Sequence, residues 1–275
     1  MLNHIHVIAH RGASAYAPEN TLASFKRAEV LGAGCIEFDV QLTADKALVV
    51  FHDETLRRTT NGRGDLIKTT SEQLSQLDAG SWFSRQFKGE PVLSFKDALL
   101  WFSTRAIKAN IEIKAAASHI EQTTLAVLRE INRHWPTSKA LPIVSSFEIK
   151  ALRICAHLMP DLPKALLLSA WRDDCVALAK ELGCKGINLS RRIVTPERVK
   201  TIKDAGFIVC VYTVNRRRDA RRYLQWGVDA VFSDYPDLLI KLSYLGAITQ
   251  AARRFFNKVF KKIWIKLPES PKIIR

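Results

Sequence analysis

Titratable side chains in the first 114 residues stand at the ends of short apolar runs or interrupt them. Residues two apart on a strand share a face, so the pairs at 37 and 39 and at 112 and 114 point the same way. Imidazoles can exchange protons, carboxylates can hold a cation, and guanidinium or ammonium groups bind anions. The group consists of His10, Arg11, Glu37, Asp39, His52, Asp53, Glu112 and Lys114.

Three of these carboxylates lie in apolar surroundings and predict a bound cation. Glu37 and Asp39 interrupt the segment Cys-Ile-Glu-Phe-Asp-Val, and Glu112 lies within Ile-Glu-Ile. Burying unpaired charge is costly, and three inward carboxylates repel one another unless a cation neutralises them. Oxygen ligands favour Mg²⁺ or Ca²⁺. A zinc site built on His10 and His52 is the alternative.

The remaining side chains suit the chemistry of a phosphodiester. A metal ion together with Arg11 and Lys114 can hold the phosphoryl oxygens and the charge that builds on them. Arg11 can make a bidentate contact, which a lysine cannot. His10 and His52 can divide the work of base and acid on opposite sides of phosphorus.

The elements that must position these residues alternate between two types. Short β-branched or apolar runs are followed by helix-like segments, which indicates βα units and a parallel sheet. Eight strands are expected, at Val7–Ala9, Cys35–Val40, Ala109–Ile113, Ile143–Ser145, Lys164–Leu168, Gly186–Leu189, Phe207–Thr213 and Ala230–Phe232. Helices are expected at Thr21–Leu31, Ser94–Phe102, Ile120–His134, Phe147–His157, Trp171–Leu182, Pro196–Ala205, Asp219–Trp226 and Pro236–Leu245. This α/β order predicts a (β/α)₈ TIM barrel, whose catalytic residues lie at the C-terminal ends of the strands.

One segment breaks the alternation. After the strand at 35–40, the connection to Leu48–His52 is too short for a helical crossover, so this run must return as an antiparallel hairpin partner. The hairpin brings His52 and Asp53 near Asp39. Residues 54–90 are polar and contain several glycines, and we interpret them as a small cap inserted over one end of the barrel.

Ordered motifs along residues 6–245 resemble those of the glycerophosphodiester phosphodiesterase family. No single motif is decisive, but the ordered set is highly specific. It comprises His10-Arg11-Gly12, Pro18-Glu19-Asn20-Thr21, Glu37-x-Asp39, His52-Asp53, Arg58-Thr59-Thr60-Asn61-Gly62, Gly80-Ser81-Trp82-Phe83, Glu112-x-Lys114, Tyr212-Thr213-Val214-Asn215, Gly227-Val228-Asp229 and Ser233-Asp234-Tyr235-Pro236.

The resemblance implies a metal-dependent hydrolase that splits glycerophosphodiesters into sn-glycerol 3-phosphate and an alcohol. By resemblance, one divalent cation, Mg²⁺ or Ca²⁺, has Glu37, Asp39 and Glu112 as its ligands. His10 and His52 are the implied acid–base pair.

The resemblance also implies supporting roles around that centre. Arg11 and Lys114 would contact the phosphate, and Glu19, Asn20 and Asp53 would support the residues that touch the substrate or the metal. A helix-capping role is the alternative for Asn20. Tyr212 stands where the family usually carries tryptophan in the substrate pocket, which leaves the preference for the alcohol open.

Composition limits the other classes of protein. With 47% hydrophobic and 25% charged residues, the chain of 275 residues is neither disordered nor a disulfide scaffold. No apolar run approaches the ~18 residues that span a bilayer, and no apolar signal segment opens the chain. The five scattered cysteines are expected to be reduced core residues. We therefore expect a cytoplasmic location, with peripheral contact at the inner membrane surface as an extension of that hypothesis.

Nearly half of the net charge of +15 lies near the end of the chain. Residues 1–245 are expected to form the barrel, and residues 246–275, with eight basic side chains and one acidic, a basic amphipathic helical extension. Apolar and basic residues in 248–266 follow helical spacing, which suits an anionic membrane surface. The alternative is a terminal helix docked on the barrel.

Two other functions compete with the leading hypothesis. Within enzymes, the rival is a lysophospholipase D that acts on lysophospholipids at a membrane. Outside enzymes, the rival is a binding module that uses its basic surface to hold an anionic ligand such as nucleic acid. This module predicts a broken set of catalytic residues. Because every expected residue is present, we expect a small-molecule substrate and no nucleic acid.

Overall fold

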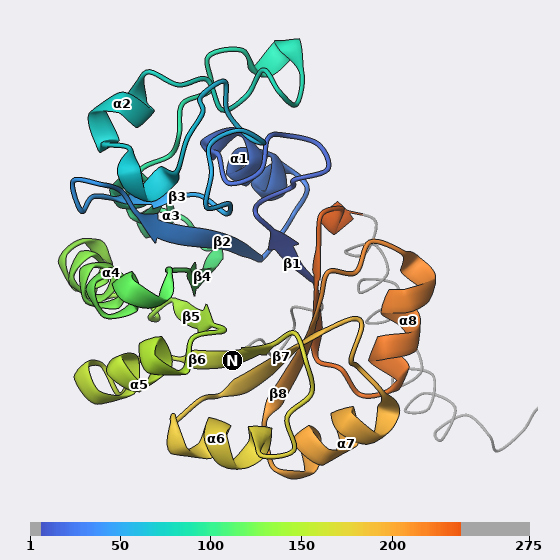
Figure 1. The fold of residues 1–275 in the computed structure, drawn as a ribbon. Helices are drawn as coiled ribbons and strands as arrows, with labels where there is room; N and C mark the ends of the chain where they lie inside the picture. Colours follow the sequence, from blue (N-terminus) through green and yellow to red (C-terminus); the bar gives the residue numbers. More distant parts are fainter. Residues whose placement is uncertain (1–6, 238–275) are drawn as a thin grey trace, which may run out of the picture.

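The computed structural model describes residues 7–237, and these form a closed barrel with helices around it (Figure 1). Eight parallel strands pair in sequence order, and the barrel closes because β1 pairs with both β9 and β2. The strands are β1 (Val7–His10), β2 (Cys35–Leu42), β4 (Lys108–Ile113), β5 (Ile143–Ser146), β6 (Lys164–Leu168), β7 (Gly186–Ser190), β8 (Ile208–Tyr212) and β9 (Ala230–Ser233). The expected (β/α)₈ barrel is confirmed.

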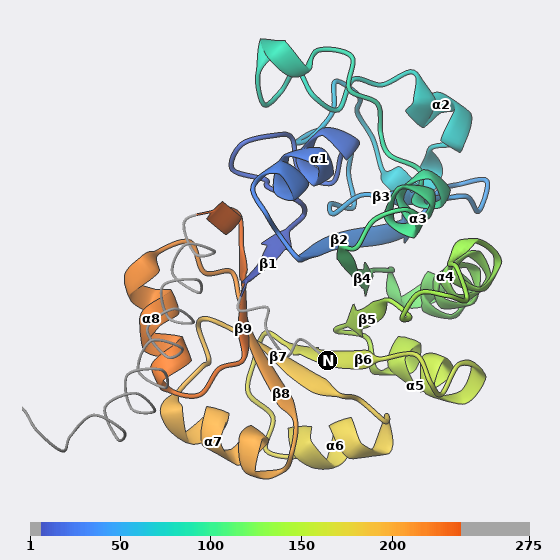
Figure 2. The ribbon, with the colours of Figure 1, turned by 180° about the vertical axis from the view of Figure 1, so that it is seen from behind.

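The helices lie outside the strands, as the view from behind also shows (Figure 2). They are α1 (Leu22–Val30), α3 (Phe95–Ser103), α4 (Ile120–His134), α5 (Ile149–Leu158), α6 (Cys175–Glu181), α7 (Pro196–Asp204) and α8 (Arg217–Gln225). Thr21, Ser94 and Thr195 cap α1, α3 and α7 by accepting a backbone N–H, which satisfies donors that a helix start leaves open. Most bounds agree with the sequence within two residues.

The start of α6 differs from the expectation. The sequence predicted a helix from Trp171, but the helix begins at Cys175. Trp171 Nε1 donates to Asp173, and Arg172 donates twice to Asp174, so side chains in this turn bond locally. Such local bonds give the backbone an alternative to the helix.

A hairpin leaves the barrel after β2. The short strand β3 (Leu48–Val50) runs antiparallel to β2, with Val40 opposite Val50. It ends before His52, earlier than predicted. Gln41 on β2 donates to the carbonyls of Phe51 and Asp53 at 3.0 and 3.1 Å, which fixes the chain beyond the strand.

The segment 54–90 packs over β3 around its own small apolar cluster. Leu56, Leu66 and Leu74 pack with Val49 and Phe51. The segment contains a five-residue helix that was not predicted from the sequence and two short 3₁₀ turns. These elements are α2 (Ser71–Ser75), η1 (Leu66–Lys68) and η2 (Arg85–Phe87). The segment therefore carries apolar packing of its own in addition to its contact with the barrel.

The core between barrel and helices is rich in aromatic side chains. Phe25 of α1 packs against Phe38 of β2 and Phe102 of α3, at ring-centroid distances of 5.3 and 5.6 Å. These contacts fix β2, the strand that carries Glu37 and Asp39, against its covering helices. All five cysteines are buried and unpaired, as predicted.

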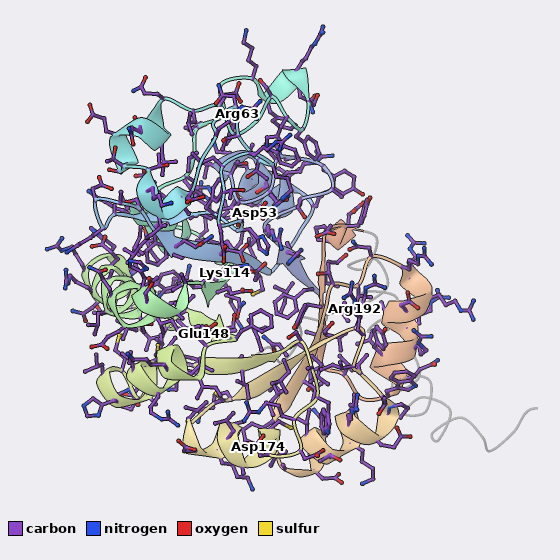
Figure 3. All side chains as sticks on the ribbon, viewed as in Figure 1. Asp53, Arg63, Lys114, Glu148, Asp174 and Arg192 are labelled. Atoms are coloured by element: carbon purple, nitrogen blue, oxygen red, sulfur yellow. The ribbon has the colours of Figure 1, made fainter. Side chains whose placement is uncertain are left out.

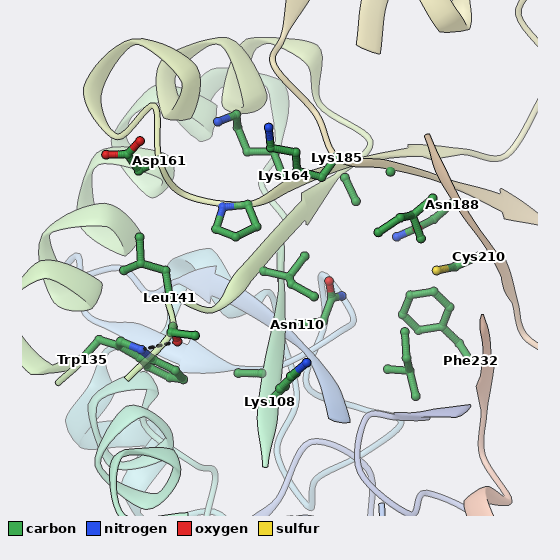
Figure 4. Close-up of a pocket in the computed structure, with 18 of the residues that line it drawn as sticks. Lys108, Asn110, Trp135, Leu141, Asp161, Lys164, Lys185, Asn188, Cys210 and Phe232 are labelled. Carbon is green, nitrogen blue, oxygen red and sulfur yellow. Dashed lines mark hydrogen bonds between the residues drawn. The ribbon is translucent and has the colours of Figure 1, made fainter. Parts of the chain in front are cut away.

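An apolar cavity of about 350 Å³ opens at the N-terminal ends of the strands (Figure 4). Its wall includes Trp135, Leu141 and Phe232, and Trp135 donates to the carbonyl of Ala140 at 3.0 Å. It lies at the opposite end of the strands from the predicted chemistry.

Some expectations lie outside the described residues. Most of the helix expected at 236–245 and the whole extension 246–275 belong to this group. Within residues 7–237, no helix combines the length and the apolar character that crossing a membrane requires.

Candidate active site

Strand register brings three carboxylates together at the mouth of the barrel. On adjacent strands, His10 lies opposite Glu37, and Asp39 lies opposite Glu112. One oxygen each of Glu37, Asp39 and Glu112 lies within 4.8 Å of the others. In the described part of the chain, these three form the one group of metal-ligating side chains, and neither His10 nor His52 belongs to it. The geometry favours the carboxylate site over the zinc alternative.

Burial and mutual repulsion oppose full ionisation of this triad. Burial and the charges of Asp39 and Glu112 raise the pKa of Glu37 well above its usual value. Burial and Asp39 raise the pKa of Glu112 to about 8. Burial also disfavours the charged form of Asp39, but Arg11 and Lys114 lower its pKa. Oε1 of Glu37 is buried and has no hydrogen-bond partner. The triad is thus short of positive charge.

The two predicted phosphate contacts face the triad. Nε of Arg11 lies 3.4 Å from Asp39, and its Nη1 donates to Glu19 at 2.7 Å. Nζ of Lys114 lies 3.7 Å from Asp39 and 3.8 Å from Glu112. Both cationic side chains therefore lie where they could contact an anion bound to a metal ion held by the triad.

A sharp turn of the chain after β1 directs the side chain of Arg11 toward the triad. Arg11 and Gly12 both adopt positive φ, 54° and 82°. A Cβ atom at residue 12 would lie 2.3 Å from Oγ of Ser24, so only glycine fits. Ser24 Oγ donates to the carbonyl of Arg11 at 2.9 Å, and the backbone N–H of Arg11 donates to Glu37 at 3.0 Å. The turn thus ties the motif to α1 and to the triad.

Asn20 supports the triad and does not cap a helix. It is buried at positive φ, and its Nδ2 donates to Oδ2 of Asp39 at 2.8 Å. The cap of α1 is Thr21, whose hydroxyl accepts from the N–H of Ser24. The capping alternative for Asn20 is therefore wrong.

His10 is held by an ionised carboxylate. Its Nδ1 lies 2.6 Å from Oδ1 of Asp234, directly after β9. Burial disfavours the ionised form of Asp234, but hydrogen bonds from His10, Asn215 and Ser14 bring its pKa down to about 2. An ionised carboxylate only accepts, so Nδ1 carries the proton and Nε2 is left for the site.

His52 has the same arrangement. Its Nδ1 lies 2.6 Å from Oδ1 of Asp53, and hydrogen bonds from Arg58 lower the pKa of Asp53. Burial lowers the pKa of His52 itself, although the charge of Asp39 opposes the effect. His52 therefore favours the neutral imidazole, with Nε2 as the free acceptor.

A cavity of about 580 Å³ lies beside His52 and the triad. Its wall includes Glu112, Lys114 and Glu148, and Figure 3 places Lys114 and Glu148 on the side of the mouth formed by β4 and β5. Tyr212 is not among the lining residues. Its hydroxyl donates to the carbonyl of Leu168 at 2.9 Å, and its ring meets that of Phe147, a lining residue, at 5.9 Å. Contact between Tyr212 and substrate stays a prediction.

Asp234, Asn215 and Arg58 belong to the motifs, but the sequence pattern predicted no role for them. Asp234 follows β9 directly, so the strand-end rule that selected the other residues also applies to it. Arg58 lies in the irregular segment after the hairpin, where no periodicity predicts the direction of a side chain. Its two carboxylate partners, Glu19 and Asp53, become visible only in the fold.

The fold and the site together define a barrel enzyme equipped for hydrolysis of a phosphate diester. Residues 10–238 match the model of the Glycerophosphoryl diester phosphodiesterase family. The chain belongs to this family, and it is a phosphoric diester hydrolase.

Named relatives agree with the family. The chain is 37% identical over 239 residues to a glycerophosphodiester phosphodiesterase of Caldanaerobacter subterraneus, covering 86% of this chain and 96% of that protein. It is 34% identical to one of Bacillus subtilis, covering 86% and 85%. Among solved structures, a phosphodiesterase of Oleispira antarctica in complex with the product sn-glycerol-3-phosphate aligns with a TM-score of 0.83 and 36% identity, covering 87% and 96%.

Proposed function

We propose that the enzyme uses a divalent cation and two histidines to hydrolyse glycerophosphodiesters to sn-glycerol 3-phosphate and an alcohol. One observation carries the proposal: a buried carboxylate triad lies at the same mouth as two histidines whose Nδ1 atoms are each held by a carboxylate. The complex of the Oleispira antarctica relative with sn-glycerol-3-phosphate supports the choice of product. No comparison favours the lysophospholipase D alternative.

The triad fits a hard divalent cation. Its ligands are all oxygens, two of the carboxyls have raised pKa values, and Oε1 of Glu37 has no partner. Glu37, Asp39 and Glu112 would hold Mg²⁺ or Ca²⁺, the ions that prefer such ligands. When bound, the cation supplies Lewis acidity toward a phosphoryl oxygen and neutralises the triad.

The protein residues then orient and protonate the substrate. Arg11 and Lys114 bind the phosphate oxygens. Glu19 orients the guanidinium of Arg11 by accepting a hydrogen bond from its Nη1. His52, whose pKa is lowered by burial, accepts through Nε2 the proton of the hydroxyl that attacks phosphorus, which is either water or the 2-hydroxyl of the glycerol. His10, with a proton on each ring nitrogen and Asp234 at Nδ1, donates its Nε2 proton to the leaving oxygen, which departs as the alcohol.

Chelation tests the proposal. The assay measures release of sn-glycerol 3-phosphate from glycerophosphocholine. We expect a chelator to abolish release, and excess Mg²⁺ or Ca²⁺ to restore it, because the triad needs a cation to hold its charges together. Replacement of Glu37 by Ala should remove most activity at every metal concentration. Glu72→Ala, at an exposed carboxylate on α2, is the control and should stay active. Full activity in excess chelator would rule out the metal assignment.

We also propose that the extension 246–275 binds an anionic membrane surface, and that the enzyme is cytoplasmic. The five unpaired cysteines support a reducing compartment. Each basic side chain near an anionic leaflet adds up to ~1 kcal/mol of attraction.

Deletion of the extension tests its role. Loss of residues 246–275 should release the protein from anionic vesicles at low salt and leave hydrolysis of a soluble diester almost unchanged. Sedimentation with vesicles, with thermal melts alongside, measures both effects. A full-length protein that stays in the supernatant, or a truncated one that melts much earlier, would favour the docked helix.

A further inference from the structure

Arg58 spans two carboxylates with one guanidinium. Nη1 and Nη2 donate to the two oxygens of Glu19 at 2.6 and 2.8 Å. Nε and Nη2 donate to the two oxygens of Asp53 at 2.7 and 2.8 Å. Both contacts are bidentate, a geometry that gives direction as well as attraction and that a lysine cannot reproduce.

Each of these carboxylates also holds a residue of the proposed mechanism. Glu19 accepts from Nη1 of Arg11 at 2.7 Å, and Asp53 lies 2.6 Å from Nδ1 of His52. Arg58 is thus linked to the guanidinium of Arg11 through Glu19, and to the imidazole of His52 through Asp53. Both links start from the side chain of Arg58, which belongs to the segment 54–90.

Arg58 balances the negative charges of Glu19 and Asp53. The side chain of Glu19 is only 12% exposed, and its cation Arg11 is shared with Asp39. Arg58 contributes to the lowered pKa of Glu19 and is the leading cause of the lowered pKa of Asp53. Without Arg58, the negative charge of Asp53 would act on His52 alone, and Glu19 would rely on Arg11 alone.

We propose that Arg58 is a positioning residue that fixes Arg11 and His52 at the same time, so that the inserted segment sets the geometry of the active site. The inference rests on the proposed function for the roles of those two residues. A purely structural role, in which Arg58 only fastens the segment to the barrel, is the competing explanation. Leu56, Leu66 and Leu74 also pack the segment against Val49 and Phe51 of the hairpin, so Arg58 is not its sole attachment.

Kinetics of Arg58→Ala separate the two explanations. Supporting residues at catalytic centres typically contribute 10- to 100-fold, so we expect kcat to fall by about that factor. KM should rise as well because Arg11 loses its fixed orientation. Arg58→Lys should recover only part of kcat because its single ammonium cannot hold both carboxylates. The control is Arg57→Ala, an adjacent exposed arginine with no partner within residues 7–237, which should match the parent enzyme.

A double-mutant cycle tests whether Arg58 acts through Glu19. If it does, Glu19→Gln and Arg58→Ala together should lower kcat/KM by less than the product of the two single effects. Independent effects that multiply would overturn this path. Unchanged kcat and KM in Arg58→Ala, with only an earlier thermal melt, would leave the structural explanation in place.

A titration of His52 by nuclear magnetic resonance does not need turnover. The charged groups that face His52 are Asp39, Arg11, Lys114 and Asp53. Removal of Arg58 takes away the cation that shares Asp53, so the pKa of His52 should rise in Arg58→Ala and stay unchanged in Arg57→Ala. An unchanged pKa in Arg58→Ala overturns the inference even in an enzyme that fails to hydrolyse glycerophosphodiesters, a failure that would count against the proposed function alone.

Discussion

At the scale of single residues, the same arrangement occurs twice at the mouth of the barrel. Asp234 holds His10, and Asp53 holds His52, each at 2.6 Å from Nδ1. A carboxylate in this position fixes the tautomer and the ring orientation and leaves Nε2 free. Asp53 follows His52 directly and was assigned from the sequence, whereas Asp234 lies 224 residues after His10 and was not.

Three substitutions test these pairs. His10→Ala and His52→Ala should each lower kcat by about 10²-fold or more, the usual scale of acid–base catalysis. Asp234→Asn should lower it by about 10- to 100-fold, because an amide does not fix the Nδ1-protonated tautomer as an ionised carboxylate does. Ser14→Ala is the control, since it removes a 3.0 Å hydrogen bond to Asp234 but keeps the carboxylate. Near-parental kcat in either histidine variant would remove that residue from the mechanism.

At the scale of elements, the turn between β1 and α1 joins the site to the barrel. Gly12 lies against Ser24 of α1, and a Cβ at residue 12 would also approach the backbone carbon of Ser24 to 2.7 Å. A side chain cannot rotate away from a backbone atom, so the turn itself must shift. Any shift moves Arg11, which precedes Gly12 in the chain.

Gly12→Ala should therefore destabilise the protein and lower its activity. Alanine at positive φ costs about 1–2 kcal/mol, and the overlap with Ser24 adds to this. Gly32→Ala is the control, since Gly32 also has φ of 82° but nothing lies within 4 Å of its added Cβ. Denaturant unfolding of the two variants measures the difference. Equal stability would show that the contact with Ser24 has no energetic weight.

The same scale shows which features the sequence made predictable. Period-two patterning and strand ends located β2 and β4, and with them Glu37, Asp39 and Glu112, because register aligns neighbouring strand ends. The five-residue helix α2 was missed, since it depends on a capping box between Thr70 and Gln73 and is too short for a helical period to show. Contacts such as that between His10 and Asp234 depend on closure of the barrel, and no local pattern encodes them.

At the scale of the whole molecule, a chain with net charge of +15 gathers carboxylates at its catalytic end. The overall positive potential draws anionic substrates toward the protein. The local potential at the triad is of the opposite sign and draws a divalent cation. Without such a cation, burial and the charge of Asp39 raise the pKa values of Glu37 and Glu112 and so favour their protonated forms.

Metal binding, folding stability and pH must therefore be linked. A carboxyl whose pKa is raised on folding, as that of Glu112 is to about 8, stabilises the fold below its unfolded pKa and loses that contribution as pH rises through 8. The metal-free protein thus loses this stability between about pH 4.5 and 8. A cation must displace the same protons, so its affinity rises over the same window. At a concentration of 100 times its Kd, a bound ligand adds about 2.7 kcal/mol to the free energy of unfolding.

We expect the difference in Tm between the protein in Mg²⁺ and the protein in chelator to be small at pH 5 and several degrees at pH 8. Glu112→Gln should flatten this pH dependence, whereas the exposed-site control Glu72→Gln should not. A difference that is constant with pH, or larger in acid, would contradict the linkage.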